Sequence, residues 1–563
     1  RENLLLHQPG LTSRSGAQRI CEVIAHEIAH QWFGNLVTPS DWRYLWLNES
    51  FATYFGFGIV DHYRPEWEIW SQFILSQTDA ALRRDGLRET FPIEIPGGEH
   101  LVINTSTAPI IYSKGGSILR QVEGYIGADN FQKGLRHYLK TYEYDNAASQ
   151  NLWEAFEQVS TQPIGKMMES WIEQPGFPMI SVKKEGNRLH LVQQRFSYLP
   201  ADSDQNWQVP ITICFFAGAE ETERITFLMN STRHEIELPE QADAYKLNDQ
   251  QTGFYIVRYL DRDNLAALGQ RVGDQSLAPE DRWGLQNDLF SLCKRGEVSF
   301  SEYLDFLADY QDENAFLPLV SISNNLQHAY LVMGAEKQEK ISSLVYPWFE
   351  KILQQIGFEP GPDEKHTTAI LREQLLWHAA MSGSQGAIEF ARDRFAGWMQ
   401  NQPVHPDIMK SVLQIAAFAG NQQTFTQLDH RFQQSQVEHE RMNILVALGC
   451  FKDKISLQNA LQYILDKVPA RNKFVPVVAM ASNPYAIPLL WDWYVSNLEQ
   501  IEKFHPMMYE RVVASIVPTA GMDNPQEVRK FFEGYMQKTD KARDVIRLSL
   551  EKLEINLRMR AAN

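Results

Sequence analysis

Two changes in residue pattern divide this chain and constrain its fold more than any other feature. Strand-like alternation and β-branched residues appear between about residues 176 and 260, in segments such as NRLHLVQQRF, VPITICFF and ERITFLMN. Apolar residues recur at helical spacing on either side of this region, as in SEYLDFLADY in the C-terminal part. The pattern therefore predicts a small β-sandwich between two helical regions.

The length of the chain, 563 residues, exceeds what one compact core normally accommodates, so several domains are expected. We predict a helical domain at residues 1–175, a β-sandwich at 176–260 and a C-terminal helical domain at 261–563. Some three hundred residues of paired helices without a strict repeat indicate a divergent, HEAT-like array in the last domain. The predicted fold class is a multidomain, mainly α protein.

The composition excludes some classes of partner. The chain carries 53 basic and 70 acidic side chains, a net charge of −17, whereas nucleic acid or an anionic membrane favours a basic surface. No apolar run reaches the roughly eighteen residues that span a bilayer. We therefore expect neither nucleic acid nor a membrane as a partner, and the oligomeric state is not predicted.

The four cysteines of the chain are far apart and match no metal-binding spacing; they are Cys21, Cys214, Cys293 and Cys450. We expect buried free thiols, which are typical of a reducing compartment and favour a cytoplasmic location. The chain begins at Arg1 and not at a methionine. We therefore expect that an N-terminal part, with any targeting segment, lies outside it.

The segment VIAHEIAHQWFGN, from Val23 to Asn35, contains two histidines four residues apart. On an α-helix such residues lie on nearly the same face, so His26 and His30 can bind one metal ion. Glu27 lies about 100° further round the helix, where its carboxylate can take a proton from a metal-activated water. This spacing is typical of a zinc hydrolase, although two histidines of the core would also fit it.

A catalytic zinc ion needs a third protein ligand, and Glu49 is the candidate. Eighteen residues separate it from His30, and it stands at the start of a second helical run that is rich in aromatic residues. A carboxylate in such an apolar setting is expected to be paired or bound to metal, because a lone buried charge is costly. The alternative is that Glu49 caps a helix. We predict one zinc ion per chain, bound by His26, His30 and Glu49.

These motifs resemble those of the zinc aminopeptidases related to aminopeptidase N, a family of gluzincins. The resemblance rests on HEIAH, the eighteen-residue gap and WLNES, and it continues through HQWFGNLVTPSDW, PGFPMISV and EDRWGLQNDLF. It covers nearly all of the chain and is closest to the group that includes puromycin-sensitive aminopeptidase and the archaeal tricorn-interacting aminopeptidases. It implies a thermolysin-like catalytic domain, of which this chain has the helical part, and hydrolysis of peptides with a free N-terminus.

The resemblance also implies a role for Tyr112. The family has a tyrosine followed by x-Lys-Gly whose hydroxyl stabilises the oxyanion of the reaction, and IIYSKGGSILR matches this motif. A phenol can donate a hydrogen bond to developing negative charge, so the role is chemically reasonable. From the residues alone, Tyr112 fits a packing position before a helix equally well.

One part of the family's pattern is not found. The Gly-x-Met-Glu-Asn loop that reads the substrate's free amino group precedes the zinc helix in the family. This chain starts with RENLLL, which resembles the segment after that loop. A near match at residues 521–524 carries Asp in place of Glu and is interpreted as a turn between helices. We therefore expect that the chain alone binds zinc but has little aminopeptidase activity.

The sequence thus predicts a zinc-dependent aminopeptidase in which Glu27 is the general base and Tyr112 stabilises the transition state. The first alternative is a zinc endopeptidase or an epoxide-opening hydrolase on the same scaffold, which would not need a free amino group. The second is a non-catalytic helical scaffold that binds partners, which would not need intact zinc ligands and a base. The preferred N-terminal residue of the substrate is not predicted.

Overall fold

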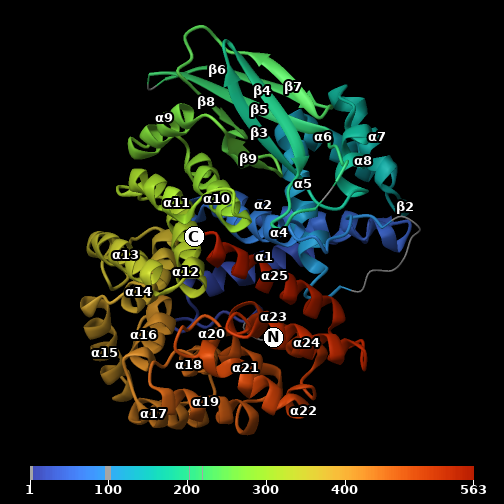
Figure 1. Cartoon of the computed structure of the whole chain (residues 1–563). Coiled ribbons are helices and arrows are strands. Elements are labelled where there is room, and N and C mark those ends of the chain that lie inside the picture. Colours follow the sequence, from blue (N-terminus) through green and yellow to red (C-terminus); the bar gives the residue numbers. More distant parts are fainter. Residues whose placement is uncertain (1–3, 96–102, 202, 219) are drawn as a thin grey trace. The chain divides into compact units, whose positions relative to one another are not determined.

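Most of the chain is helical, and two small sheets occupy the region where the sequence predicted strands (Figure 1). The computed structural model describes residues 4–95, 103–201, 203–218 and 220–563. Within these residues, helices precede and follow the sheets, and the longest helical part is C-terminal. The predicted fold class, a mainly α protein with a small β region and a C-terminal helical array, is confirmed.

The α-helices that precede the sheets are α1 (Arg14–Ala29), α2 (Trp46–Tyr63), α3 (Ile69–Phe73), α4 (Asp79–Asp85), α5 (Gly115–Ile126), α6 (Ala128–Thr141), α7 (Ser149–Ser160) and α8 (Ile164–Ile172). Most residues of α2 are buried, as expected for a helix that is hydrophobic around its circumference. Two short strands, β1 (Val37–Pro39) and β2 (Asp145–Ala147), pair in parallel within this region. The sequence pattern did not predict them.

The strands of the β region are β3 (Pro178–Glu185), β4 (Arg188–Arg195), β5 (Val209–Ala217), β6 (Glu220–Met229), β7 (Arg233–Glu237), β8 (Ala244–Leu247) and β9 (Ile256–Tyr259). They form one sheet of order β7-β4-β3-β9 and another of order β6-β5-β8. Neighbouring strands are antiparallel except β3 and β9, which run parallel with Ile180 opposite Val257. Burial alternates along β4, so one face of its sheet covers the core.

The helices after the sheets are α9 (Arg262–Gly273), α10 (Pro279–Arg295), α11 (Phe300–Phe306), α12 (Phe316–Val332), α13 (Ala335–Ile356), α14 (His366–Met381), α15 (Gln385–Met399), α16 (Pro406–Phe418), α17 (Gln422–Gln434), α18 (Glu438–Leu448), α19 (Lys454–Asp466), α20 (Phe474–Met480), α21 (Ile487–Ser496), α22 (Leu498–Ile501), α23 (Pro506–Ala520), α24 (Pro525–Met536) and α25 (Arg543–Ala561). Side chains of Ser384, Asn421 and Asp453 cap the N-termini of α15, α17 and α19. Helix α14 packs on α16, α16 on α18, α18 on α20, α20 on α23 and α23 on α25. This succession is the helical array that the sequence predicted.

The chain forms two compact units, residues 22–321 and residues 1–21 with 322–563. In the second unit, Arg14 forms an ion pair with Glu364, with 2.9 Å between Nη1 and Oε1. Strands of the β region begin at Pro178 and end at Tyr259, but the compact units do not divide there. The predicted limits of the three domains therefore stay predictions.

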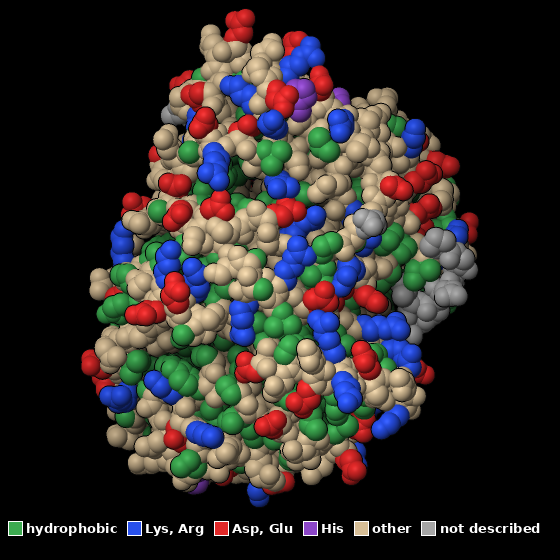
Figure 2. Space-filling model, in the orientation of Figure 1, with side chains coloured by type: hydrophobic (Ala, Val, Ile, Leu, Met, Phe, Trp, Pro, Cys, Tyr) green, Lys and Arg blue, Asp and Glu red, His purple; other side chains and the backbone are tan. Residues whose placement is uncertain are grey.

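Acidic and basic side chains are interspersed over the visible face of the molecule (Figure 2). No helix in the described part of the chain combines the length and the apolar character that crossing a bilayer requires. All four cysteines are free; Cys214, Cys293 and Cys450 are buried, and Cys21 is half-buried. The prediction of buried free thiols is therefore confirmed for three of the four cysteines, and Cys21 is free but not fully buried.

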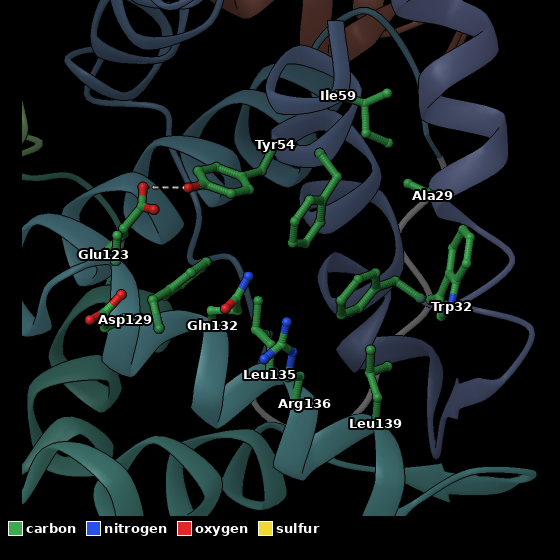
Figure 3. Close-up of a pocket in the computed structure, with 14 residues that line it drawn as sticks. Ala29, Trp32, Tyr54, Ile59, Glu123, Asp129, Gln132, Leu135, Arg136 and Leu139 are labelled. Carbon is green, nitrogen blue, oxygen red and sulfur yellow. Dashed lines mark hydrogen bonds between the residues drawn. The ribbon is translucent and has the colours of Figure 1, made fainter. Parts of the chain in front are cut away.

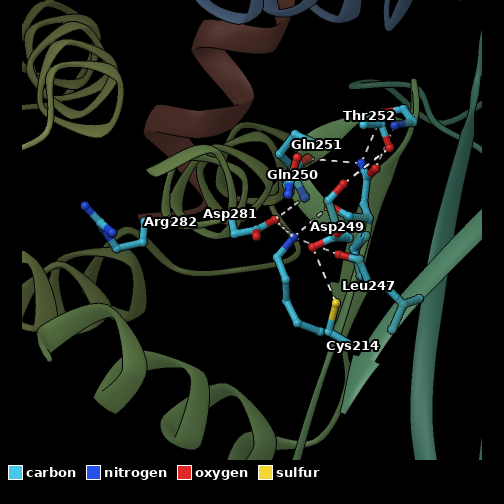
Figure 4. Close-up of polar contacts among 12 residues, drawn as sticks. Cys214, Leu247, Asp249, Gln250, Gln251, Thr252, Asp281 and Arg282 are labelled. Atoms are coloured by element: carbon cyan, nitrogen blue, oxygen red, sulfur yellow. Dashed lines mark hydrogen bonds and ion pairs between the residues drawn. The ribbon is translucent and has the colours of Figure 1, made fainter. Parts of the chain in front are cut away.

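A buried polar cluster fixes the turn that follows β8 (Figure 4). The Lys246 ammonium lies 2.5 Å from Oδ1 of Asp281 and donates hydrogen bonds to the carbonyls of Leu247 and Asn248. Asp281 also accepts a hydrogen bond from the backbone N–H of Gln250, at 2.8 Å. Both charged side chains are almost completely buried, so the loss of either would leave the other without its counter-charge.

Replacing Lys246 by methionine is expected to lower the free energy of unfolding by about 3 kcal/mol, because Asp281 would lose its buried partner. Urea denaturation followed by circular dichroism measures the change. Lys183→Met is the control, because the ion pair of Lys183 with Glu185 is exposed and should contribute little. Equal destabilisation by the two variants would contradict the importance of the buried pair.

Candidate metal centre

Three side chains that the sequence predicted as ligands lie together in the structure. Nε2 of His26 is 3.2 Å from Nε2 of His30, and Oε2 of Glu49 is 3.4 Å from the first nitrogen and 3.6 Å from the second. Ligand atoms bound at about 2.1 Å to a tetrahedral zinc ion lie about 3.4 Å apart. The three donor atoms therefore form a triangle whose size and chemistry fit one zinc ion.

Helices α1 and α2 bring these ligands together. His26 lies near the end of α1, His30 follows its last residue, and Glu49 lies in the first turn of α2. Gly56 permits the two helices to approach closely. A Cβ at this position would lie 3.3 Å from the carbonyl oxygen of Glu22, which is tighter than most such contacts, and 3.4 Å from Cα of His26, so a side chain here would press against α1.

A backbone carbonyl orients the ring of His30. Nδ1 of His30 lies 3.2 Å from the carbonyl oxygen of Phe33, so a neutral ring that donates this hydrogen bond presents the lone pair of Nε2 to the metal position. The Phe33 ring stacks on Phe51 and Phe55, with ring centroids 4.4 and 5.2 Å apart. This aromatic cluster of Phe33, Phe51 and Phe55 therefore fixes the carbonyl and, through it, the imidazole.

Glu27 and Tyr112 lie beside these ligands. The Tyr112 ring stacks on His26, with centroids 6.1 Å apart and planes inclined by 13°. Burial raises the pKa of Tyr112 well above its ordinary value, and the Glu49 and Glu27 carboxylates raise it further, so the phenol keeps its proton. Glu27 is exposed. The structure brings all five predicted residues into one neighbourhood, whereas their chemical roles stay predictions.

Tyr112 lies in a π-helical turn, Pro109–Lys114, which leads directly into α5. Such turns are uncommon and are frequently found at functional sites. The hydroxyl of Ser50 donates a hydrogen bond to the carbonyl of Ile111, at 2.6 Å, and ties the turn to α2. Ser50 was not predicted from the sequence, where its only signal is its position directly after Glu49.

A separate hollow of about 460 Å³ adjoins the aromatic cluster (Figure 3). Its wall is mostly apolar, and the Tyr54 hydroxyl donates a hydrogen bond to Glu123, at 2.5 Å, on one side of it. Phe33 and Phe55 line the hollow, but none of the five predicted site residues does. The hollow is therefore not part of the candidate metal centre.

Comparison with known proteins matches both the N-terminal and the C-terminal parts of the chain to family models. Residues 1–171 match the model of the peptidase family M1 domain. Residues 244–555 match the model of the ERAP1-like C-terminal domain. The first match contains every residue of the candidate metal centre, and the second covers the last strands and most of the helical array.

Several similar proteins are aminopeptidases by name. The chain is 32% identical to "Aminopeptidase M1" of Arabidopsis thaliana over 588 residues, which covers 99% of the chain and 65% of that relative. It is 29% identical to "Leucyl aminopeptidase" of Saccharolobus solfataricus, with 91% of the chain and 63% of the relative covered. It is 30% identical to "Alanine/arginine aminopeptidase" of Saccharomyces cerevisiae, with 86% and 57% covered. The chain thus spans less than two thirds of the length of each of these relatives.

Gly115 begins α5 and faces α2 so closely that an added Cβ would lie 1.9 Å from Oγ of Ser50. Gly115→Ala is expected to displace Ser50 and the turn that contains Tyr112, and to lower the free energy of unfolding by about 1–3 kcal/mol. Urea denaturation measures this change. Gly58→Ala in α2 is the matched control, because its Cβ would meet Trp70 at an ordinary 3.5 Å. A Gly115→Ala variant as stable as Gly58→Ala would contradict the close packing.

Proposed function

We propose that this chain, which belongs to the M1 peptidase family and carries an ERAP1-like C-terminal domain, provides the catalytic centre of a zinc-dependent aminopeptidase. The observation that carries the proposal is the triangle of donor atoms from His26, His30 and Glu49, beside Tyr112. The proposed substrate is a peptide with a free N-terminus, in keeping with the names of the relatives.

Each residue of the centre has a distinct part in this chemistry. His26, His30 and Glu49 would hold the ion through two imidazole nitrogens and one carboxylate oxygen, a set that suits catalytic zinc. When bound, zinc polarises the scissile carbonyl and lowers the pKa of a water molecule. Glu27 takes the proton of the attacking water and later delivers it to the leaving amine.

Tyr112 acts on the carbonyl oxygen of the substrate. Its phenol donates a hydrogen bond as negative charge develops on that oxygen. Because this bond strengthens as the reaction proceeds, it accelerates the chemical step more than it tightens substrate binding.

Within the family, we propose that this chain is related to the group that includes puromycin-sensitive aminopeptidase and the archaeal tricorn-interacting aminopeptidases. Its support is the set of motifs HEIAH, WLNES and YSKGG, together with the similarity to a plant, a yeast and an archaeal relative. The names of the archaeal and the yeast relative refer to different amino acids, so they favour no particular N-terminal residue for this chain.

His26→Ala, His30→Ala and Glu49→Ala are each expected to lower the amount of bound zinc, because each removes one of three protein ligands. Glu27→Gln should retain zinc yet lose hydrolysis of an aminoacyl fluorogenic substrate, since an amide cannot accept the proton. Mass spectrometry measures the zinc content, and initial rates measure the hydrolysis. Both measurements use protein expressed from the complete gene. Zinc loss in Glu27→Gln as large as in His26→Ala would contradict this division of roles.

The N-acetylated form of the same peptide separates an aminopeptidase from an endopeptidase. An aminopeptidase needs the free amine, so it should leave the acetylated peptide intact while it cleaves the unmodified one. Cleavage of both peptides at similar rates would replace the proposed function by the endopeptidase alternative.

Tyr112→Phe is expected to lower kcat about a hundredfold or more with little change in KM, because the lost hydrogen bond acts mainly in the transition state. Steady-state kinetics at equal zinc content measures the change. Tyr54→Phe is the control, because it removes a hydroxyl that bonds to Glu123 in the same compact unit. A Tyr112→Phe variant with unchanged kcat would remove Tyr112 from the mechanism.

A further inference from the structure

We propose that the buried ion pair between Lys114 and Asp85 positions Tyr112 toward the metal ligands, which makes Lys114 and Asp85 positioning residues. The inference rests on the proposed function, in which Tyr112 donates a hydrogen bond to the substrate. Lys114 follows Tyr112 by two residues in the same π-helical turn, whereas Asp85 is the last residue of α4.

The Asp85 carboxylate is the centre of a closed set of contacts. Its Oδ2 lies 2.9 Å from Nζ of Lys114, and both side chains are 0% exposed. Its Oδ1 accepts hydrogen bonds from the Thr90 hydroxyl, at 2.6 Å, and from the backbone N–H of Gly176, at 3.1 Å. Lys114 in turn donates to the carbonyl of Gly176, at 3.0 Å. The ammonium, the carboxylate and the backbone of one glycine therefore fix one another.

Gly176 gives the two charges a rigid partner. Its φ of 85° lies in the region that favours glycine, and a Cβ there would lie 2.7 Å from Nε of Arg195. The segment before β3 is thus constrained both by its backbone conformation and by packing. Through Gly176, the ion pair joins this segment and the end of α4 to the turn that contains Tyr112.

A second contact restrains the turn on the other side of Tyr112. The hydrogen bond from Ser50 to the carbonyl of Ile111, at 2.6 Å, ties the turn to α2, and Ser50 directly follows Glu49. This bond therefore sets the turn relative to a proposed metal ligand. Tyr112 is held between two anchors, one to α2 and one to α4, and neither uses its hydroxyl group.

The hydrogen bonds around this ion pair differ from apolar packing because they are directional. The burial of two charges costs desolvation energy, so such a pair is weak evidence for stability in itself. Its ammonium must, however, reach the carboxylate and the carbonyl at hydrogen-bonding distance, which fixes the path of the lysine side chain. The loss of the pair should therefore displace Tyr112 in addition to lowering stability.

Asp85→Asn tests the proposal, because it keeps the shape of the side chain and removes its charge. The variant is made in protein expressed from the complete gene. Its kcat for an aminoacyl fluorogenic substrate is expected to fall about tenfold, while KM stays within about twofold of the unmodified protein's value and the zinc content is unchanged. A single fluorotyrosine incorporated at position 112 should report the displaced phenol as a shifted or broadened ¹⁹F signal.

Glu313→Gln is the matched control, because Glu313 forms another buried ion pair in the same compact unit, with 2.7 Å between its Oε2 and Nε of Arg282. This variant should lose stability without a change in kcat or in the ¹⁹F signal. Equal losses of kcat in Asp85→Asn and Glu313→Gln would overturn the proposal. A folded Asp85→Asn variant with unchanged kcat and an unchanged signal would overturn it as well.

Lys114→Arg covers the case in which Asp85→Asn does not fold. It keeps the charge, but the longer guanidinium must hold the turn at a different point, because arginine and lysine are not equivalent in a tight buried site. It should show the same fall in kcat and the same change in the ¹⁹F signal. A folded Lys114→Arg variant that matches the unmodified protein in both measurements would overturn the proposal.

The ¹⁹F signal separates this proposal from the proposed function. If the unmodified protein, fully loaded with zinc, released no amino acid from a peptide, the proposed function would fail. The ¹⁹F comparison of Asp85→Asn with Glu313→Gln would still decide whether the ion pair positions Tyr112.

Discussion

The close approach of three donor atoms is the constraint on which the arrangement of the first helices depends. The side chains of His26, His30 and Glu49 meet within 3.6 Å, although each loses hydration by doing so. The fold permits this because α1 and α2 approach closely at Gly56 and because the aromatic cluster holds the carbonyl that orients His30. A shared cation would stabilise two imidazole nitrogens and a carboxylate oxygen at such distances. The packing of the two helices therefore creates a set of donors that suits a metal ion.

Buried ion pairs fix parts of the unit 22–321 that apolar packing would leave adjustable. The pair of Lys114 with Asp85 lies beside the turn of Tyr112, and the pair of Lys246 with Asp281 lies beside the turn after β8. Each desolvates two charges, so the pair itself adds little net stability, whereas the loss of one partner would leave a buried charge unpaired. A turn has fewer internal hydrogen bonds than a helix and no continuous apolar face, and it therefore gains most from contacts of defined direction.

The sequence predicted the features that depend on local spacing. His26 and His30 share a helix face because they are four residues apart, and the alternation in β4 follows from the geometry of a strand. Contacts between distant segments leave no such local trace, so neither the ion pair of Lys114 with Asp85 nor the pairing of β1 with β2 was predicted. Tyr112 was found only through its family motif, because nothing in its immediate sequence distinguishes it from a packing tyrosine.

The two glutamates of the centre differ in surroundings, and this difference agrees with the proposed roles of Glu49 as a ligand and Glu27 as a base. Glu49 has a side chain that is only 17% exposed, and its Oε2 lies 3.4 and 3.6 Å from two imidazole nitrogens. Such a fixed position suits a ligand, because metal affinity depends on donors that are already held in place. Glu27 is exposed and lies about 100° round α1 from His26. The proposed base must reach the proton of the attacking water and later the leaving amine, whereas a carboxylate held on the ion as a ligand is not free to carry that proton.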